Sequence, residues 1–282
     1  MSTVPQPWVG LVDDAAMFPP GDLPLPEAVA AHVARREEWY AALVGPLVVK
    51  DVDVPQIDAR LAVSVVLTGG AGSVGGAATL CGRSPTDLAG LEVALADLDD
   101  LPGNAHRVAA AVDAAHAAGV LDPEVPVYVE LPHVAATGSW LAAADVVAGS
   151  GFRLKFRTGG LSPDAFPPAH ALARWIDAAL DRETPFKCTA GLHHAVRHTA
   201  GDTGFEHHGF LNVLVTTRLL FDGTPVADAV AALEERDPAS LVAQATELDV
   251  AGARRWFTSY GSCSVTDPLT DLIALGLLED GA

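Results

Sequence analysis

The chain has 282 residues, half of them hydrophobic, and a formal net charge of −19. This length and hydrophobic content allow one large α/β domain or two small ones. So acidic a surface argues against nucleic acid and anionic membranes as partners.

The cysteines and the hydrophobic runs indicate in which cellular compartment the protein is found. The cysteines, Cys81, Cys188 and Cys263, are widely spaced and form no CxxC pattern, which indicates reduced thiols. No apolar run is long enough to span a bilayer, and the first residues do not resemble a signal peptide. We therefore expect a cytoplasmic protein.

Eight short runs have the composition of β-strands, and helix-like segments separate most of them. The runs are Trp8–Asp13, Leu47–Asp51, Leu61–Leu67, Leu91–Asp97, Val127–Leu131, Phe152–Phe156, Phe186–Ala190 and Arg255–Tyr260. The clearest helical segments are Pro26–Leu43, Ala105–Ala118, Ser139–Ala148, Pro168–Asp181, Phe210–Leu220 and Pro268–Leu277. This alternation predicts parallel βαβ units and, with eight strands and no low-complexity linker, a single α/β domain over residues 1–282 with a (β/α)8 TIM barrel fold.

An open doubly wound sheet is the alternative fold. It lacks support because no G-x-G-x-x-G stands between the first strand and the first helix. A Gly-rich stretch, "TGGAGSVGGA", lies instead between the third and fourth runs, where we expect a loop followed by a short helical start in "SPTDLAG". Without a following Lys-Ser/Thr, the stretch is only a weak phosphate-binding signal.

The three lysines of the chain, Lys50, Lys155 and Lys187, all fall on strand-like segments, whereas the helical segments carry arginine. Alternate residues of a barrel strand face the interior. In "FRLKF" the apolar Leu154 and Phe156 should face the helices, so Lys155 and its neighbours Arg153 and Arg157 should point inward.

The same alternation applies to the two strands beside it. In "FKCTA" it directs Lys187 and Thr189 inward, and in "VYVEL" it directs Tyr128 and Glu130 inward. Glu130, Lys155 and Lys187 should therefore meet in one lumen, toward the carboxyl ends of the strands where barrel active sites lie.

Two buried lysines suggest Schiff-base chemistry. Burial and a nearby like charge lower a lysine's pKa, and a neutral amine can attack a carbonyl carbon. We expect Lys155, between Arg153 and Arg157, to be the more neutral lysine and Lys187 to stay charged, with Glu130 as proton shuttle or counter-ion. A buried ion-pair cluster without chemistry is the alternative.

The C-terminal half resembles a known family. "LKFRTGG" carries Lys155 on the sixth run, "FKCTAGLHH" carries Lys187 on the seventh, and "YGSCS", Tyr260 to Ser264, ends the eighth. This arrangement resembles the class I aldolases of the deoxyribose-phosphate aldolase type, which carry K-T-x-T-G on strand six, a second lysine before a Gly-Gly loop on strand seven and a G-x-S phosphate loop after strand eight. The resemblance implies that Lys155 forms the Schiff base.

The chain also departs from that family. Arg157 replaces a small hydroxyl residue, the loop after the seventh run reads Gly191-Leu192-His193, and the fourth-strand E-V-D becomes Glu92-Val93-Ala94. The family's acid is therefore missing, and Glu130 or Asp97 would have to replace it. The resemblance implies Schiff-base chemistry more firmly than it implies deoxyribose phosphate as the substrate.

Other polar residues near the strand ends are candidates for binding the substrate. Asp13 and Asp14 end the first run, where acids can also bind a metal, cap the next segment or pair with inward arginines, and Lys50 ends the second, as a lumen cation or an edge ion pair. The full set of substrate-binding candidates is Asp13, Asp14, Lys50, Arg157, Gly159, Gly160, His193, His194, Ser259, Gly261 and Ser262. Cys263 is a weak candidate for a nucleophile because no positioned base is evident.

Five histidines and a glutamate crowd into a predicted loop between residues 193 and 208. Such residues can bind zinc or iron, although no H-E-x-x-H or facial-triad spacing occurs. They can equally contact a substrate or phosphate, or simply be solvated in a long loop.

The sequence thus predicts a Schiff-base-forming aldolase or lyase with Lys155, Lys187 and Glu130 as catalytic residues and no cofactor. Its partner is a small oxygenated carbonyl compound, with or without a phosphate group. A metal-dependent hydrolase or lyase using the histidines and a non-catalytic barrel that binds an anionic metabolite are the alternatives. The sequence leaves open whether the chain forms a homo-oligomer.

Overall fold

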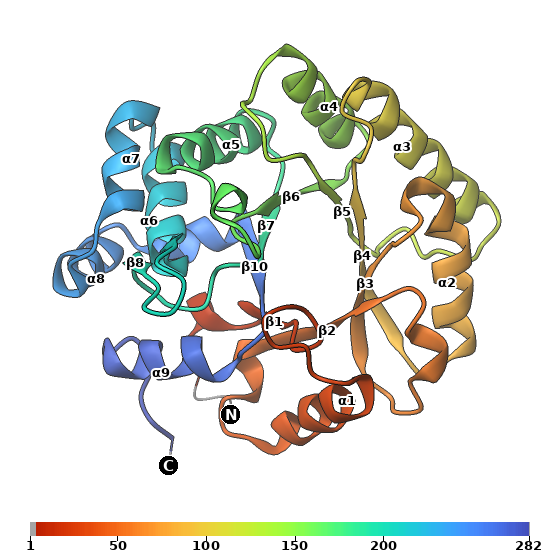
Figure 1. Ribbon diagram of the computed structural model, residues 1–282, viewed down its shortest axis with the longest axis horizontal. Coiled ribbons are helices and arrows are strands. Elements are labelled where there is room, and N and C mark those ends of the chain that lie inside the picture. Colours follow the sequence, from red (N-terminus) through yellow and green to blue (C-terminus); the bar gives the residue numbers. More distant parts are fainter. Residues whose placement is uncertain (1–3, 282) are drawn as a thin grey trace.

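The computed structural model describes residues 4–281, and its centre is a closed barrel of eight parallel strands (Figure 1). Around the barrel the strands follow the order β1-β10-β7-β6-β5-β4-β3-β2. They are β1 (Val12–Asp14), β2 (Val44–Lys50), β3 (Ala62–Val66), β4 (Asp87–Ala94), β5 (Val127–Glu130), β6 (Arg153–Arg157), β7 (Phe186–Thr189) and β10 (Phe257–Ser262). The predicted (β/α)8 TIM barrel is confirmed.

Helices surround the barrel on the outside (Figure 1). They are α1 (Leu25–Ala34), α2 (Val74–Arg83), α3 (Leu101–Ala117), α4 (Gly138–Gly149), α5 (Ala169–Asp181), α6 (Phe210–Phe221), α7 (Val226–Glu234), α8 (Pro238–Glu247) and α9 (Thr266–Ala274). Helices α2, α7 and α8 lie outside the helical segments expected from the sequence. None of the helices within residues 4–281 is long and apolar enough to cross a membrane.

The Gly-rich stretch is the clearest difference from the sequence-based expectation. Most of it is helical, because a 3₁₀ turn over Gly70–Ser73 leads into α2 at Val74. The segment expected to start a helix instead contains the start of β4, at Asp87. Glycine costs a helix about 1 kcal/mol relative to alanine. Burial of one face of α2 in the core offsets this cost, through Val74, Ala77 and Ala78.

The first helix is shorter than expected. It ends at Ala34, and two 3₁₀ turns, Arg35–Glu37 and Ala41–Leu43, follow it. Since β2 begins at Val44, the chain has to reverse direction before that residue, and a helix running to Leu43 would leave no room for the turn.

A continuous aromatic layer lies between the strands of the lysine side of the barrel and the helices that cover them. Phe156 of β6 packs on Trp140 of α4, with ring centroids 6.2 Å apart, and on Phe186 of β7 at 5.2 Å. Phe186 in turn stacks on Phe257 of β10 at 5.4 Å. Because these rings are buried on the helix-facing side, the alternate residues of the same strands must face the lumen.

The connection from β7 to α6 is long and carries a small antiparallel sheet of its own. This sheet pairs β8 (His198–Thr199) with β9 (Glu206–His207). We call residues 190–209 the histidine loop. It stands at the carboxyl-terminal end of the barrel, since it follows directly on β7.

Candidate functional site

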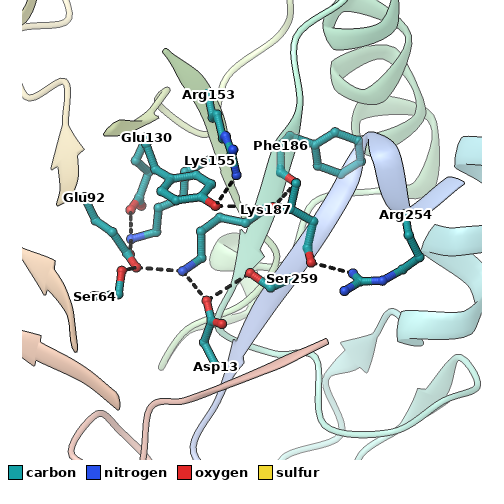
Figure 2. A network of polar contacts seen from close by, with 12 residues as sticks. Asp13, Ser64, Glu92, Glu130, Arg153, Lys155, Phe186, Lys187, Arg254 and Ser259 are labelled. Atoms are coloured by element: carbon teal, nitrogen blue, oxygen red, sulfur yellow. Dashed lines mark hydrogen bonds and ion pairs between the residues drawn. The ribbon is translucent and has the colours of Figure 1, made fainter. Parts of the chain in front are cut away.

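The site is built on the lumen faces of β4, β5, β6 and β7. In the strand register Glu130 lies beside Lys155, and Lys155 lies beside Lys187. Their side chains point into the lumen, as the alternation predicts, and come together with Glu92 and Asp13 (Figure 2). Both lysines are almost completely buried, with 3% and 1% of their surface exposed.

Glu92 of β4 joins the two lysines. Its Oε2 lies 2.7 Å from Lys155 Nζ, and its Oε1 lies 2.6 Å from Lys187 Nζ. The hydroxyl of Ser64 on β3 donates to the same Oε1 at 2.6 Å. One carboxylate therefore neutralises part of both ammonium charges and fixes the two amines on either side of it.

Each lysine has a second acid of its own. Lys155 Nζ lies 2.9 Å from Glu130 Oε2, and Arg157 binds the other oxygen of that carboxylate at 2.8 Å. Lys187 Nζ lies 2.5 Å from Asp13 Oδ2, which also accepts from Ser259 Oγ at 2.9 Å. Asp13 is positioned by β1, which only the closure of the barrel brings near β7.

These contacts overturn the expected protonation state of the lysines. Burial lowers the pKa of Lys155, but Glu92 and Glu130 outweigh burial and hold this pKa above its ordinary value. Burial likewise lowers the pKa of Lys187, and Asp13 and Glu92 raise it well above the usual range. The expectation of a partly neutral Lys155 is wrong for this arrangement, because ion pairs prevail over desolvation.

The two arginines expected to push Lys155 toward neutrality bind other groups. Arg157 pairs with Glu130, and Arg153 donates from its guanidinium to the Tyr128 hydroxyl at 3.0 Å, toward the amino-terminal end of the barrel. Lys155 therefore shares both of its carboxylates with another cation, Glu130 with Arg157 and Glu92 with Lys187. Lys187 shares only Glu92.

Burial and the neighbouring cations shift the pKa values of the three carboxylates in different directions. Burial raises the pKa of Glu92, but Lys155 and Lys187 together reverse the effect and bring it far below its usual range. Burial also raises the pKa of Glu130, but Lys155 and Arg157 outweigh it and lower this pKa below its ordinary value. Burial raises the pKa of Asp13 in spite of Lys187 and Ser259.

A cavity of about 510 Å³ opens over the lysines at the carboxyl ends of the strands. That size suits a small-molecule ligand. Side chains of Glu92, Glu130, Lys155 and Lys187 line it together with apolar residues such as Phe18, Val48 and Val66.

Close contact between two loops explains the glycines that follow β6 and β7. Gly191 has a φ of +77°, and a Cβ there would lie 2.8 Å from the Thr158 carbonyl oxygen; a Cβ on Gly159 would lie 2.7 Å from Gly191 Cα. The loops after β6 and β7 therefore touch backbone to backbone beside the cavity, which only glycine permits.

Five of the predicted substrate-binding residues line the cavity: Arg157, Gly159, Gly160, His193 and Gly261. Asp13, on β1, does not line it but forms an ion pair with Lys187. The amine of Lys50 lies 5.8 Å over the ring of Phe18, and its side chain is exposed.

The remaining predicted residues serve other contacts. Asp14 faces α1, where its Oδ2 binds His32 Nδ1 at 3.0 Å and Arg35 at 2.6 Å, so its placement in the substrate site is wrong. Ser259 supports Asp13 below the cavity. Ser262 donates to the Ser264 carbonyl at 2.7 Å, and His194 pairs with Asp271 at 3.2 Å outside the lumen cavity.

Sequence reasoning missed Glu92, the acid with the most contacts to the lysines. The comparison with E-V-D placed the acid at Ala94, and Asp97 was considered as its replacement. Asp97 is instead exposed and pairs with Arg107 at 3.1 Å. The signal for Glu92 was the same alternation used for Lys155, since Leu91 and Val93 are apolar and face outward.

The histidine loop forms no recognisable metal site. Within residues 4–281 no group of three or more His, Cys, Asp or Glu side chains is arranged to hold a metal ion. The rings pack on one another instead: His198 lies 4.7 Å from His194 and 5.1 Å from His207 between centroids. Cys263 has His193 nitrogens at 3.8 and 3.9 Å, yet burial raises the pKa of its thiol, which disfavours a nucleophilic role.

Comparisons with known proteins assign the chain to no family. Neither a scan against protein-family models nor a search of curated proteins finds a match to this chain. The function has to be inferred from the lumen itself.

Proposed function

We propose that the chain is a Schiff-base-forming lyase of the class I aldolase type, acting on a small oxygenated carbonyl compound through Lys155. The observation that supports this most is the position of the Lys155 amine. It borders a cavity of about 510 Å³ at the carboxyl ends of the strands and lies between two carboxylates, 2.7 and 2.9 Å away.

In the proposed reaction Lys155 first loses a proton, and Glu130 is the acceptor. The raised pKa of Lys155 and the lowered pKa of Glu130 oppose this transfer, so the neutral amine is a minor species that the reaction consumes. The neutral amine then adds to the carbonyl carbon, a C–N bond forms, and the carbonyl electron pair moves to the oxygen, which takes up a proton. Loss of water from this carbinolamine leaves a protonated imine. The imine accepts electrons from an adjacent C–C or C–H bond as that bond breaks.

Lys155 is preferred over Lys187 because its charge is less well compensated. Glu130 divides its charge between Lys155 and Arg157, whereas Lys187 has Asp13 at 2.5 Å and the Tyr128 ring at 5.1 Å. Lys187 also lowers the pKa of Lys155 by charge repulsion. In this proposal Lys187 stays charged and stabilises the developing negative charge on the substrate oxygen.

The test is borohydride reduction in the presence of a panel of aldehydes and ketones, followed by peptide mapping of the wild-type protein. Reduction turns an imine into a stable amine, so the label marks the nucleophile without any mutation. We expect the label on Lys155; the exposed Lys50 serves as an internal reference for non-specific reaction. Label on Lys187 alone would reverse the two roles, and protein that binds carbonyl compounds without labelling would be a binding protein.

Substitutions extend this test. Lys155→Met keeps the length of the side chain and should abolish labelling, while Lys187→Met should slow it and raise its optimum pH, since the repulsion that lowers the pKa of Lys155 is lost. Far-ultraviolet circular dichroism and thermal melting check that each variant folds.

A further inference from the structure

A second cavity of about 330 Å³ adjoins the lumen cavity beneath the histidine loop. The two share wall residues, among them Gly160, Leu161, Ala190 and His193, so they are continuous at the mouth of the barrel. We call the second cavity the vestibule. A ligand held by Lys155 and too long for the lumen extends into it.

Rings make up much of the vestibule wall. Phe166 lies 4.5 Å from His207 and 5.5 Å from Phe205 between ring centroids, and His198 stacks on His207. Burial lowers the pKa of both His193 and His198, which favours their neutral form, whereas the hydrogen bond to Asp271 raises the pKa of His194. Much of the wall is therefore aromatic, and His194, whose pKa is raised, already pairs with Asp271.

The charges near the vestibule disfavour an anion. Among its described lining residues there is no lysine or arginine, but Asp202 and Asp267 are present. A phosphate or carboxylate group would meet these like charges, while His194 in the wall already pairs with Asp271. Leu161, which borders both cavities, has 77% of its surface exposed, so a large apolar side chain is available to a ligand at the mouth.

We propose that the vestibule binds an uncharged aromatic ring, and that the substrate is an aryl-substituted carbonyl compound and not a phosphorylated one. The second half of this proposal rests on the proposed function; the ring-binding site itself does not. Aromatic rings favour offset-stacked or edge-to-face packing on other rings, which gives them an advantage over saturated groups of equal size.

The first experiment compares borohydride labelling by 3-phenylpropanal, 3-cyclohexylpropanal, propanal and glyceraldehyde 3-phosphate. We expect 3-phenylpropanal to label several-fold faster than the other three at equal concentration. The ratio of phenylpropanal to propanal labelling should fall about three- to tenfold in Phe166→Leu. It should be retained in Phe221→Leu, a matched change on α6, where Phe221 is half exposed and packs on Trp256.

Equal labelling by the phenyl and cyclohexyl compounds, faster labelling by the phosphorylated aldehyde, or an unchanged ratio in Phe166→Leu would overturn the aromatic site while leaving the Schiff base intact.

The second experiment separates the two proposals. 3-Phenylpropan-1-ol has the ring but no carbonyl and cannot form an imine. Saturation-transfer NMR should show transfer to its ring protons with wild-type protein and with Phe221→Leu, and much less with Phe166→Leu. This result without any borohydride labelling would refute the Schiff base and keep the ring site; transfer that does not depend on Phe166 would refute the ring site.

Discussion

The barrel lumen and the histidine loop both contain many titratable side chains, but the pKa values of the lysines in the lumen are raised, whereas those of His193 and His198 in the loop are lowered. In the lumen Lys155, Lys187 and Glu92 are buried and charged, because each cation has a carboxylate within 3 Å. In the loop most of the groups are histidines, and burial lowers the pKa of His193 and His198 although Asp267 and Asp271 act in the opposite direction. Close ion pairs therefore outweigh burial for the lysines of the lumen, whereas burial outweighs the more distant acids for His193 and His198 of the loop.

The largest expected effect tests the charged half of this comparison. Glu92→Gln removes the carboxylate that pairs with both buried ammonium groups. Breaking a buried ion pair costs about 3–5 kcal/mol. We expect the free energy of unfolding, measured by urea denaturation at pH 7, to fall by about that amount.

Asp87→Asn is the matched control on the same strand. Asp87 pairs with Arg60 at 3.4 Å, and both side chains are well exposed. Exposed pairs contribute about 0–1 kcal/mol. Equal losses in the two variants would mean that the lumen network is no more important to stability than a surface ion pair.

The next prediction tests the neutral half. His208 is buried, donates to the Pro167 carbonyl at 2.7 Å, and lies 3.1 Å from an Arg197 nitrogen. Burial lowers its pKa to about 4. The unfolded chain therefore binds a proton before the folded one as pH falls, so stability from this group is present above about pH 6.5 and is lost progressively down to about pH 4.

Between pH 7.5 and 4.5 this loss amounts to about 2–3 kcal/mol. The stability of His208→Gln should fall that much less than wild type over the same range, measured by urea denaturation at both pH values. His170→Gln changes an exposed histidine and should follow wild type. If His208→Gln also follows wild type, the ring is not held neutral by burial.

The smallest expected effect tests how Glu130 and Arg157 control the pKa of Lys155. Glu130→Gln removes one carboxylate from Lys155, so its pKa should fall and the midpoint of the pH profile for borohydride labelling should move down by about one unit. The maximum rate should drop as well, because the proton acceptor is gone. Arg157→Gln should move the midpoint the other way, since Glu130 then serves Lys155 alone; midpoints that move together would show that Glu130 does not control the lysine.

The alternation of apolar and polar residues along each strand was enough to predict which side chains of the site face the lumen. The period of two along a strand is set by the backbone, so apolar Leu154, Phe156 and Phe186 were enough to place Lys155 and Lys187 on the lumen side. The same pattern would have placed Glu92 there. The aromatic layer that buries those outward residues confirms the alternation.

The tertiary structure alone decided which charges meet. Asp13 reaches Lys187 because β10 joins β1 to β7 when the barrel closes, across 174 positions of sequence. That contact and the bridging of both lysines by Glu92 reverse the direction of the lysine pKa shifts, and the packing of the histidine loop turns a candidate metal site into an aromatic wall. Alternation is a property of each strand by itself, whereas the partner of a buried charge depends on strand order and register, which the sequence of one strand does not contain.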